Sequence, residues 1–398
     1  MKSNYKYLGS YIEFLNSRAL NHESILDLDS IRGISSISKT FIKTKANLVG
    51  VVADKYKVVE SGFFAYNPNT ARMGDKIPIA LNQFDYPVLV SSIYPTFKIK
   101  DINKLHPEYL MMWFHRPEFD RYARFMSHGS AREVFDIDEM YGIMLPIPSI
   151  TKQKEIVKEY NITVNNIALN QQLIQKLEAT AQAIYNQWFV EGIDLENLPD
   201  GWRVEKLKNL CEKIGSGSTP TGGKESYFTS GISLIRSTNV FDYNFSFEDL
   251  AFISDEQANK LKNVEVKKND ILFNITGVSV ARCCMVPKNV LPARVNQHVM
   301  IIRPDGKLNV SFYLLLNLCS TDSKSALLGI SQSGSTREAI TKKEIEDFEV
   351  IVPDNEILKN FEFQMQKLFS FKDMKSLENQ KLTELKDLLL SKLATIEN

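Results

Sequence analysis

Hydrophobic and polar positions divide this chain into two kinds of segment that alternate. In residues 1–150 and 199–353, short runs of β-branched and aromatic residues are separated by turns rich in Gly, Pro, Asn and Asp. Runs such as Asn47–Val52 and Val88–Ile93 have the length and composition of strands. Short helical patterns such as Glu108–Phe114 lie among them, so each segment is predicted to be a compact α+β domain.

Two further segments, residues 152–190 and 355–396, contain neither proline nor glycine and are predicted to be long helices. Along the first helix, apolar residues recur at alternating steps of three and four, which is the spacing of one helical seam. At about 1.5 Å per residue, each helix would be roughly 55–60 Å long. Two core helices of a single domain would also show such a stripe. Their length and duplication favour an antiparallel coiled coil that separates two globular domains.

The two halves of the chain repeat one another. Gly129–Glu133 aligns with Gly334–Glu338 at an offset of 205 residues, and Pro148 aligns with Pro353 at the same offset. A period near half the chain indicates a duplicated domain with pseudo-two-fold symmetry. Between these anchors the globular segments diverge, as expected for one scaffold that carries two different domains. The predicted organisation is a first domain at 1–150, a central helix at 151–197, a second domain at 198–353 and a C-terminal helix at 354–398.

The amino-acid composition is typical of a globular protein but does not indicate what the protein binds. The chain has 398 residues, 43% of them hydrophobic and 24% charged, which fits two globular domains. Its 48 basic and 48 acidic residues cancel, so a nucleic-acid partner would need local basic surfaces. The first residues do not resemble a signal peptide, and no run reaches the roughly 18 apolar residues of a membrane span. These features predict a cytoplasmic protein that has no membrane partner.

Neither a catalytic site nor a cofactor site is predicted. Four cysteines, of which Cys283 and Cys284 are adjacent, lack the spacing of a disulfide framework or a zinc site. The glycine-rich residues 215–224 faintly resemble a phosphate-binding loop, but Ser218 replaces its first glycine and Glu225 follows its lysine. The five histidines do not cluster with carboxylates or cysteines. We therefore expect a protein without enzymatic activity, metal or cofactor.

Several loops carry residues suited to reading DNA. Backbone N–H groups of Ser, Thr and Gly bind phosphate oxygens, while Arg, Asn and Gln make paired hydrogen bonds to base edges. Any one such loop is more often an ordinary solvated turn, and it is their number in one domain that favours DNA. Candidates in the second domain are Ser216, Ser218, Thr219, Arg236, Asn239, Thr276, Arg282, Asn296, Gln297, Ser333, Ser335 and Arg337. The first domain has a thinner set, namely Arg32, Arg72, Ser91, Ser92, His128, Ser130 and Arg132.

Motifs that frame the second domain point to a known family. Leu198–Trp202 opens the domain with a Leu-Pro-Asp-Gly-Trp motif, and Gly217–Pro220 forms a Gly-Ser-x-x-Pro type turn. With the Gly-Ser-x-Arg-Glu turns and the two long helices, the chain resembles the specificity subunits of type I restriction–modification systems over essentially its whole length. The first half departs from the family pattern, because it lacks the Leu-Pro-x-Gly-Trp motif and begins abruptly near Tyr5–Leu8.

The resemblance implies a non-catalytic subunit of a DNA-modifying complex. In that family, two target-recognition domains each read one part of a split, asymmetric site in double-stranded DNA. The paired helices set the distance between the half-sites and dock two methyltransferase subunits, which bind S-adenosylmethionine, and restriction subunits complete the nuclease. The docking residues expected on the helices are Ile167, Ile174, Leu177, Ile184, Trp188, Leu382, Leu385 and Leu389.

Two other interpretations stay open. The chain could be the specificity partner of a fused methyltransferase–nuclease, which the identity of the co-purifying subunit would decide. It could also be a coiled-coil adaptor whose globular domains bind proteins rather than DNA. An absence of DNA affinity in every complex would favour the adaptor.

Overall fold

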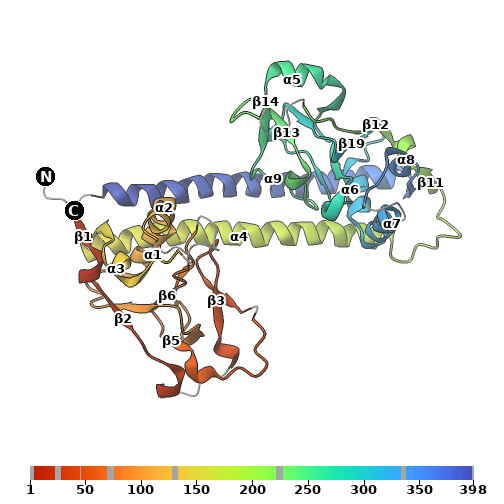
Figure 1. Ribbon diagram of the computed structural model, residues 1–398. Coiled ribbons are helices and arrows are strands. Elements are labelled where there is room, and N and C mark those ends of the chain that lie inside the picture. The colour runs from red at the N-terminus through yellow and green to blue at the C-terminus, as the bar shows by residue number, and fades with distance from the viewer. Residues whose placement is uncertain are drawn as a thin grey trace. The chain divides into compact units, whose positions relative to one another are not determined.

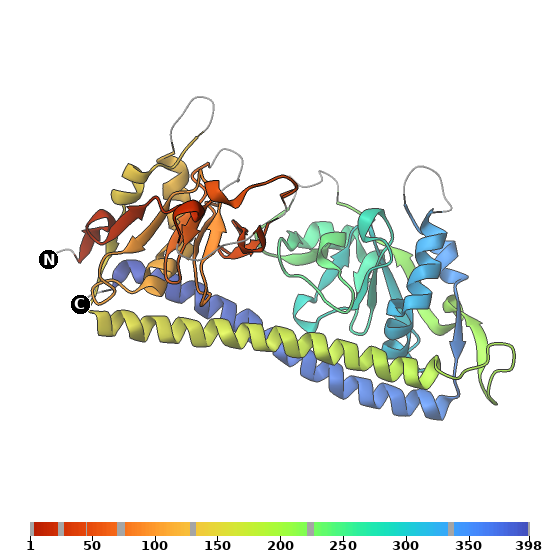
Figure 2. The same ribbon diagram turned by 90° about the horizontal axis from the view of Figure 1, so that it is seen from below.

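The computed structural model describes residues 4–22, 28–44, 46–69, 76–127, 133–220, 227–332 and 338–396. The chain forms two compact units (Figures 1 and 2). Unit 1 comprises Met1–Leu169 with Asn379–Asn398, and unit 2 comprises Asn170–Glu378. Each unit therefore contains a globular head and one portion of both long helices. Within the described ranges, no helix combines the length and the apolar character that crossing a membrane requires.

The head of unit 1 is built from two small layers of strands covered by short helices. The first layer is an antiparallel sheet in the order β2 (Ile12–Leu15), β9 (Thr96–Ile99), β6 (Phe64–Tyr66) and β7 (Ile79–Leu81). In the second layer, β3 (Arg32–Ile34) pairs with β4 (Phe41–Lys43), and β5 (Lys57–Val59) pairs with β8 (Val88–Val90). A parallel bridge between Ile31 and Leu89 joins these two pairs. The helices are α1 (Pro107–His115), α2 (Pro117–Phe125) and α3 (Ile137–Tyr141).

The head of unit 2 contains the same arrangement in a longer form. Its first sheet has the order β12 (Cys211–Ser216), β19 (Val299–Pro304), β16 (Ile271–Asn274) and β17 (Cys283–Met285). Its second has the order β14 (Ala251–Ile253), β13 (Ile232–Ile235), β18 (Ala293–Val295) and β15 (Glu265–Val266). The helices are α5 (Asp255–Lys260), α6 (Ser311–Cys319), α7 (Thr321–Gln332) and α8 (Lys342–Glu346).

The duplication extends into the heads, although their sequences differ. The parallel pairing of β13 with β18 corresponds to the Ile31–Leu89 bridge, and all other ladders between described residues of the two heads are antiparallel. Each head is closed by a pair of terminal strands that leads into a long helix. β1 (Tyr5–Tyr7) pairs with β10 (Met144–Pro146), and β11 (Arg203–Lys206) pairs with β20 (Glu349–Val352). The predicted α+β fold with two long helices is confirmed.

One predicted strand is wrong. Asn47–Val52 lies in the connection between β4 and β5 and forms no strand. The Asn47 side chain accepts a hydrogen bond from the Val49 N–H at 3.0 Å, and Gly50 has a positive φ of 74°. Both features turn the backbone, so the β-branched residues of this segment do not enter a ladder.

The two long helices, α4 (Ile150–Phe189) and α9 (Asn355–Lys392), run antiparallel in each unit. In unit 2, the C-terminal part of α4 packs against the N-terminal part of α9, and the rings of Phe189 and Phe361 lie 4.8 Å apart. In unit 1, Val157 from the start of α4 shares a core with Leu390 from the end of α9. The buried seam of unit 2 is made by Ala181, Tyr185 and Phe189 with Leu358, Phe361, Met365 and Phe369.

A buried polar side chain from each long helix holds the start of one helix of its head, α1 in unit 1 and α6 in unit 2. In unit 1, Gln153 accepts a hydrogen bond from the His106 N–H at 2.8 Å, directly before α1. In unit 2, Glu362 accepts one from the Tyr313 N–H at 2.7 Å, in the first turn of α6. These bonds satisfy N–H groups that a helix start leaves unpaired. Glu362 is almost fully buried, and burial raises its pKa from 4.5 to about 7.

We predict that Glu362→Gln stabilises the protein at alkaline pH. Because the pKa is raised in the folded state, the contribution of Glu362 to stability is fully present below pH 4.5 and is lost as the pH rises through 7. Glutamine stays neutral throughout, as Gln153 does in unit 1. The melting temperature of the variant should exceed that of the wild type only slightly near pH 5 and by several degrees at pH 8. The free-energy difference is at most about 3 kcal/mol.

Glu356→Gln, at an exposed position of the same helix, is the matched control. Its melting temperature should differ from that of the wild type by a small amount that does not change between pH 5 and pH 8. An equal response of the two variants to pH would contradict the assignment to Glu362.

Candidate nucleic-acid interface

Four loops of unit 2 meet at one end of its sheets, where β12, β13 and β16 end and β19 begins. The Gly217 N–H donates to the carbonyl of Val299 at 3.0 Å, and the Ser218 N–H donates to the carbonyl of Val295 at 3.1 Å. The Asn296 N–H donates to the carbonyl of Ile235 at 3.0 Å. The Ile275 N–H donates to the carbonyl of His298 at 3.1 Å. These bonds bring together four of the five loop regions that the sequence suggested for the second domain.

Gly217 allows the closest of these approaches. A Cβ atom at this position would lie 2.1 Å from the carbonyl oxygen of Val295 and 2.2 Å from that of Asn296. Every other residue type would therefore push the Gly217 loop away from the β18–β19 turn. The loop presents Ser216 at the surface and half-buried Ser218 and Thr219 beside it.

A chain of polar contacts orders the β18–β19 turn. The hydroxyl of Thr276 lies 2.8 Å from Nδ1 of His298, and Nε2 of His298 lies 3.2 Å from Nε2 of Gln297. The His298 N–H donates to the side-chain oxygen of Asn296, which is itself buried. Gln297 is exposed, so it is the side chain of this turn that can reach a ligand. His298 belongs to the same predicted loop and directly follows Asn296 and Gln297 in the sequence.

Arg282 and Arg236 supply the positive charge of the interface. The guanidinium of Arg282 lies 5.3 Å from the ring centre of Phe241, and that of Arg236 lies 5.9 Å from the ring centre of Tyr227. Arg236 also donates to the carbonyl of Asp249. Stacking on aromatic rings orients both cations while their charge stays available.

The prediction for Asn239 is corrected. Its side chain is fully buried, accepts a hydrogen bond from the Arg236 N–H at 3.0 Å and donates to the carbonyls of Ser246 and Glu248. All of its hydrogen-bonding capacity toward the interior is used in shaping the loop after β13. The sequence showed an amide suited to base reading, but residue type alone does not reveal that the side chain points inward.

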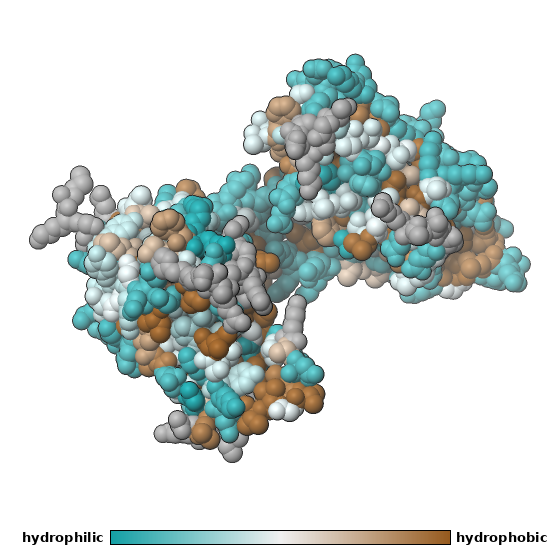
Figure 3. Space-filling model, viewed as in Figure 1, coloured by the Kyte–Doolittle hydropathy of each residue, from teal (hydrophilic) through white to brown (hydrophobic). Residues whose placement is uncertain are grey.

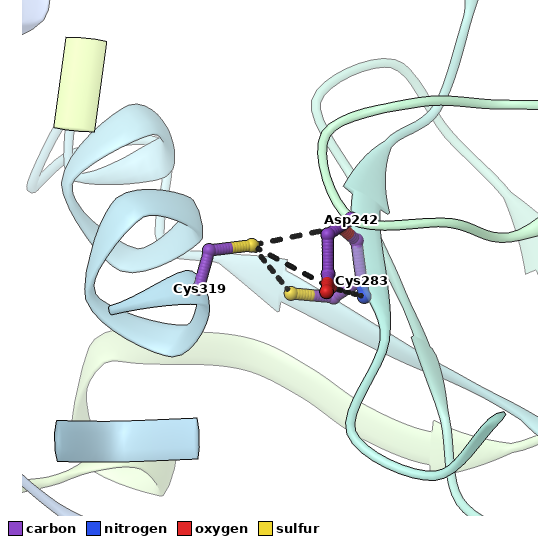
Figure 4. Close-up of side chains that lie close together, drawn as sticks. All are labelled: Asp242, Cys283 and Cys319. Carbon is purple, nitrogen blue, oxygen red and sulfur yellow. Dashed lines mark hydrogen bonds between the residues drawn. The ribbon is translucent and has the colours of Figure 1, made fainter. Parts of the chain in front are cut away.

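A polar cluster next to Arg282 holds the interface in place (Figure 4). The Sγ atoms of Cys283 and Cys319 lie 3.3 Å apart, and the Cys283 N–H donates to the carboxylate of Asp242 at 3.1 Å. By type and spacing these three residues could ligate a thiophilic metal. However, the ammonium of Lys324 lies 2.5 Å from the Asp242 carboxylate and also donates to the carbonyl of Ala281. Burial raises the pKa of the Cys319 thiol, which favours its protonated form. We therefore infer a structural role for the cluster, in which Lys324 of α7 holds the backbone at Ala281.

The first head offers fewer described candidates. Ser91 and Ser92 lie in the β8–β9 turn, which corresponds to the β18–β19 turn of unit 2. The side chain of Arg32 donates to the carbonyls of Ile31 and Asp29, which holds it against its own strand end. The remaining candidates lie outside the described residues, and these are Arg72, His128, Ser130, Arg132, Ser333, Ser335 and Arg337.

Comparisons with known proteins relate the chain to one family. A family model for the type I restriction modification DNA specificity domain matches residues 199–387. Residues 199–387 are therefore similar to the specificity domain of that family. The HindI specificity subunit of Haemophilus influenzae is 22% identical, over 73% of this chain and 77% of that protein. The MjaIX specificity subunit of Methanocaldococcus jannaschii is 24% identical, over 72% and 68% respectively.

A solved structure extends the likeness to the whole fold. The crystal structure of the type I restriction–modification S subunit from M. genitalium has a TM-score of 0.61 with 13% sequence identity. The alignment covers 99% of this chain and 96% of that one. At this identity the likeness concerns the fold, which therefore includes both heads and both helices. Together with the specificity domain, it confirms the resemblance to specificity subunits.

The docking residues predicted on the helices flanking the specificity domain are corrected in part. Ile174 is buried, and Ile184 and Trp188 pack into the core of unit 2, so these residues pair the helices or seat the head. Leu385 is exposed, whereas Ile167, Leu177, Leu382 and Leu389 are partly covered. Three- and four-residue spacing selects the face on which two helices meet, and that face is not available to a third partner. The other large apolar side chains exposed on the helices are Phe363, Phe371, Met374 and Leu377 in unit 2, and Ile162, Leu169 and Leu388 in unit 1.

We predict that Gly217→Ala disrupts the interface of the specificity domain without unfolding it. The added methyl group collides with two backbone carbonyls, so the loop must move by more than 1 Å or so to reach ordinary contact distance. Sequence-specific DNA binding of the assembled complex should weaken by about tenfold or more, the loss expected when one or two good contacts are broken.

Gly215→Ala is the matched control, because the nearest atom to its new Cβ would be the end of the flexible Lys213 side chain at 3.8 Å. Circular dichroism should show both variants folded. Equal affinities for the two variants in a mobility-shift assay would refute the role of this close approach.

Proposed function

We propose that the chain is the DNA-specificity subunit of a type I restriction–modification complex, in which each head reads one half of a bipartite, asymmetric site. The observation that carries the proposal is the loop cluster at one end of the unit 2 sheets, set in a fold that is present twice. The matches to the HindI and MjaIX specificity subunits support the same role. Two heads with one topology and different loops suit a site with two different halves.

The chemistry of the loop cluster fits direct reading of duplex DNA. The exposed amide of Gln297 can form two hydrogen bonds with an adenine edge, and the guanidinium of Arg282 can do the same with guanine. Ser216 and the neighbouring backbone N–H groups suit phosphate oxygens, which fix register rather than sequence. Because the chain has no net charge, it needs its methyltransferase partners to supply part of the phosphate contact.

The helices have the length expected of a spacer. α4 has 40 residues and α9 has 38, so each extends about 57–60 Å at 1.5 Å per residue. We infer that the antiparallel pair acts as the ruler between half-sites and carries the docking surface for two methyltransferase subunits, which bind S-adenosylmethionine. On α9 the apolar residues Phe363, Phe371 and Met374 fall on one face of the helix and are exposed. Restriction subunits join the same complex, and the chain itself contributes no catalytic group.

Methylation mapping tests the proposal as a whole. A host that expresses this chain with its cognate methyltransferase should acquire methylation at one asymmetric motif, in which two defined blocks flank a spacer of fixed length. A continuous motif, or no sequence-dependent methylation, would contradict it. A partner that carries methyltransferase and nuclease in one polypeptide would instead identify the fused type of system, and a complex without DNA affinity would identify an adaptor.

We predict that Arg282→Ala impairs recognition of one half-site only. Loss of a paired guanidinium contact costs about 1–3 kcal/mol of discrimination, which corresponds to roughly a five- to hundredfold weaker binding of the specific site. Filter binding by the assembled complex measures this change. Arg203→Ala removes a cation from β11 of the same unit and should bind like the wild type. If both variants bind equally, Arg282 does not read the site.

We predict that Met374→Asp prevents assembly with the methyltransferase. Met374 is 56% exposed on α9, and a carboxylate at the centre of an apolar contact must be desolvated without a partner. Co-purification with a tagged methyltransferase should fall to background. Val204→Asp, at a residue with 52% exposure on β11, should leave co-purification unchanged. A complex that forms normally with Met374→Asp would exclude this face as the docking surface.

A further inference from the structure

Among the described residues, the end of unit 1 that corresponds to the loop cluster of unit 2 carries exposed apolar side chains. In unit 2, the β18–β19 turn holds the polar pair Asn296 and Gln297. In unit 1, the corresponding β8–β9 turn holds Ser91, Ser92 and Ile93, and it is closed by a hydrogen bond from the Tyr94 N–H to the carbonyl of Ser91. Ile93 is 59% exposed. The same place in the fold therefore offers a different surface in the two heads.

The connection between β4 and β5 lies against this turn and adds to the apolar surface. Gly50, Val51, Val52, Lys55 and Tyr56 line a pocket of about 360 Å³ together with Ser91 and Ser92. Val49 and Val52 are 88% and 62% exposed. Figure 3 shows hydrophobic surface gathered at the end of unit 1 that carries this connection. We call Val49, Val52 and Ile93 the apolar patch.

The apolar patch is not part of the hydrophobic core of the head. A separate small core beneath it consists of Ile31, Val58 and Leu89, which are buried. Leu48 and Tyr56 pack against this core and cover it. The segment is nevertheless ordered by local bonds, among them those from the Val51 N–H to the carbonyl of Leu48 and from the Tyr56 N–H to the carbonyl of Ala53. Exposed apolar groups held on an ordered turn around a pocket are typical of a binding surface.

Cationic side chains border the apolar patch. Lys55 lines the pocket and is exposed, and Arg18 is exposed at its bridge with Lys57. Lys57 donates to the carbonyl of Tyr94 at 3.0 Å, which ties the β8–β9 turn to this basic edge. Asp54 is the acidic residue of the same turn as Lys55. A ligand that combines small apolar groups with flanking negative charges complements such a surface.

We propose that the apolar patch reads the 5-methyl groups of thymine in the half-site bound by unit 1, an inference that rests on the proposed function. The thymine methyl is the apolar feature of base-pair edges in the major groove, and aliphatic side chains contact it. Lys55 and Arg18 contact the phosphates beside it. The described part of unit 1 thus contributes apolar contacts to base selection, whereas the described part of unit 2 contributes hydrogen bonds from Gln297 and Arg282.

The test uses the complete chain in complex with its methyltransferase. Arg282→Ala identifies the half-site of unit 2, and the other half belongs to unit 1. Each thymine of that other half is replaced singly by deoxyuridine, which lacks only the methyl group, and the dissociation constant is measured. At least one replacement should weaken binding by wild type roughly three- to tenfold, the effect of losing one buried methyl group. Ile93→Ser or Val52→Ser should weaken binding to the thymine-containing site by the same factor. Replacement of that thymine by deoxyuridine should then weaken the binding of the variant no further.

Ile102→Ser is the matched control, because Ile102 is 61% exposed in the connection between β9 and α1. It should keep the full response to deoxyuridine. The inference is overturned, and the proposed function stands, if Ile93→Ser and Val52→Ser respond to deoxyuridine as the wild type does, or if the half-site contains only G·C pairs. It is also overturned if these variants lose the methyltransferase instead of affinity for thymine, since the patch would then be a protein interface. A wild-type complex without sequence preference would contradict the proposed function itself.

Discussion

An aromatic cluster where α4, α9 and α6 meet is the interaction on which unit 2 depends. The ring of Phe189 lies 4.8 Å from that of Phe361 and 5.0 Å from that of Tyr313, and all three side chains are buried. Each such ring removes roughly 150–250 Å² from water. Because the rings come from both long helices and from the head, one contact both pairs the helices and seats the specificity domain on them. Helix pairing and head position in this unit therefore cannot vary independently.

Unit 1 reaches the same arrangement with different side chains. Val157, Leu390 and Leu393 contribute aliphatic side chains to its core, and the hydroxyl of Tyr5 donates to the carbonyl of Ala394 at 2.8 Å, which fastens the first strand to the end of α9. The duplicated feature is thus the backbone frame and its helix-start bonds rather than the composition of the core. This freedom in the interior explains why sequence repetition is clear in the turns and faint in the heads.

The sequence revealed the regular and local parts of the structure. The absence of proline and glycine and the three- and four-residue spacing located both long helices, because a helix is defined by residues that are near one another in the chain. The common topology of the heads was not visible, since strand pairs such as β12–β19 join residues that are far apart and share no periodic signal. The same limitation explains Asn239, which has the right functional group but points inward. The docking prediction is wrong for the buried Ile174 because apolar spacing marks every buried face alike, whichever partner buries it.

The closing strands of each head have a further consequence. β1 pairs with β10 and β11 pairs with β20, so the polypeptide enters and leaves each head at adjacent points on one edge. An α+β module with the same two closing strands and the same contacts to the long helices could be inserted at that place without changing the helices or the surfaces they present. Genetic exchange of a head between related chains would then create a new combination of half-sites in one step, while the rest of the enzyme complex stays as it is. The paired strands make the head an exchangeable cassette.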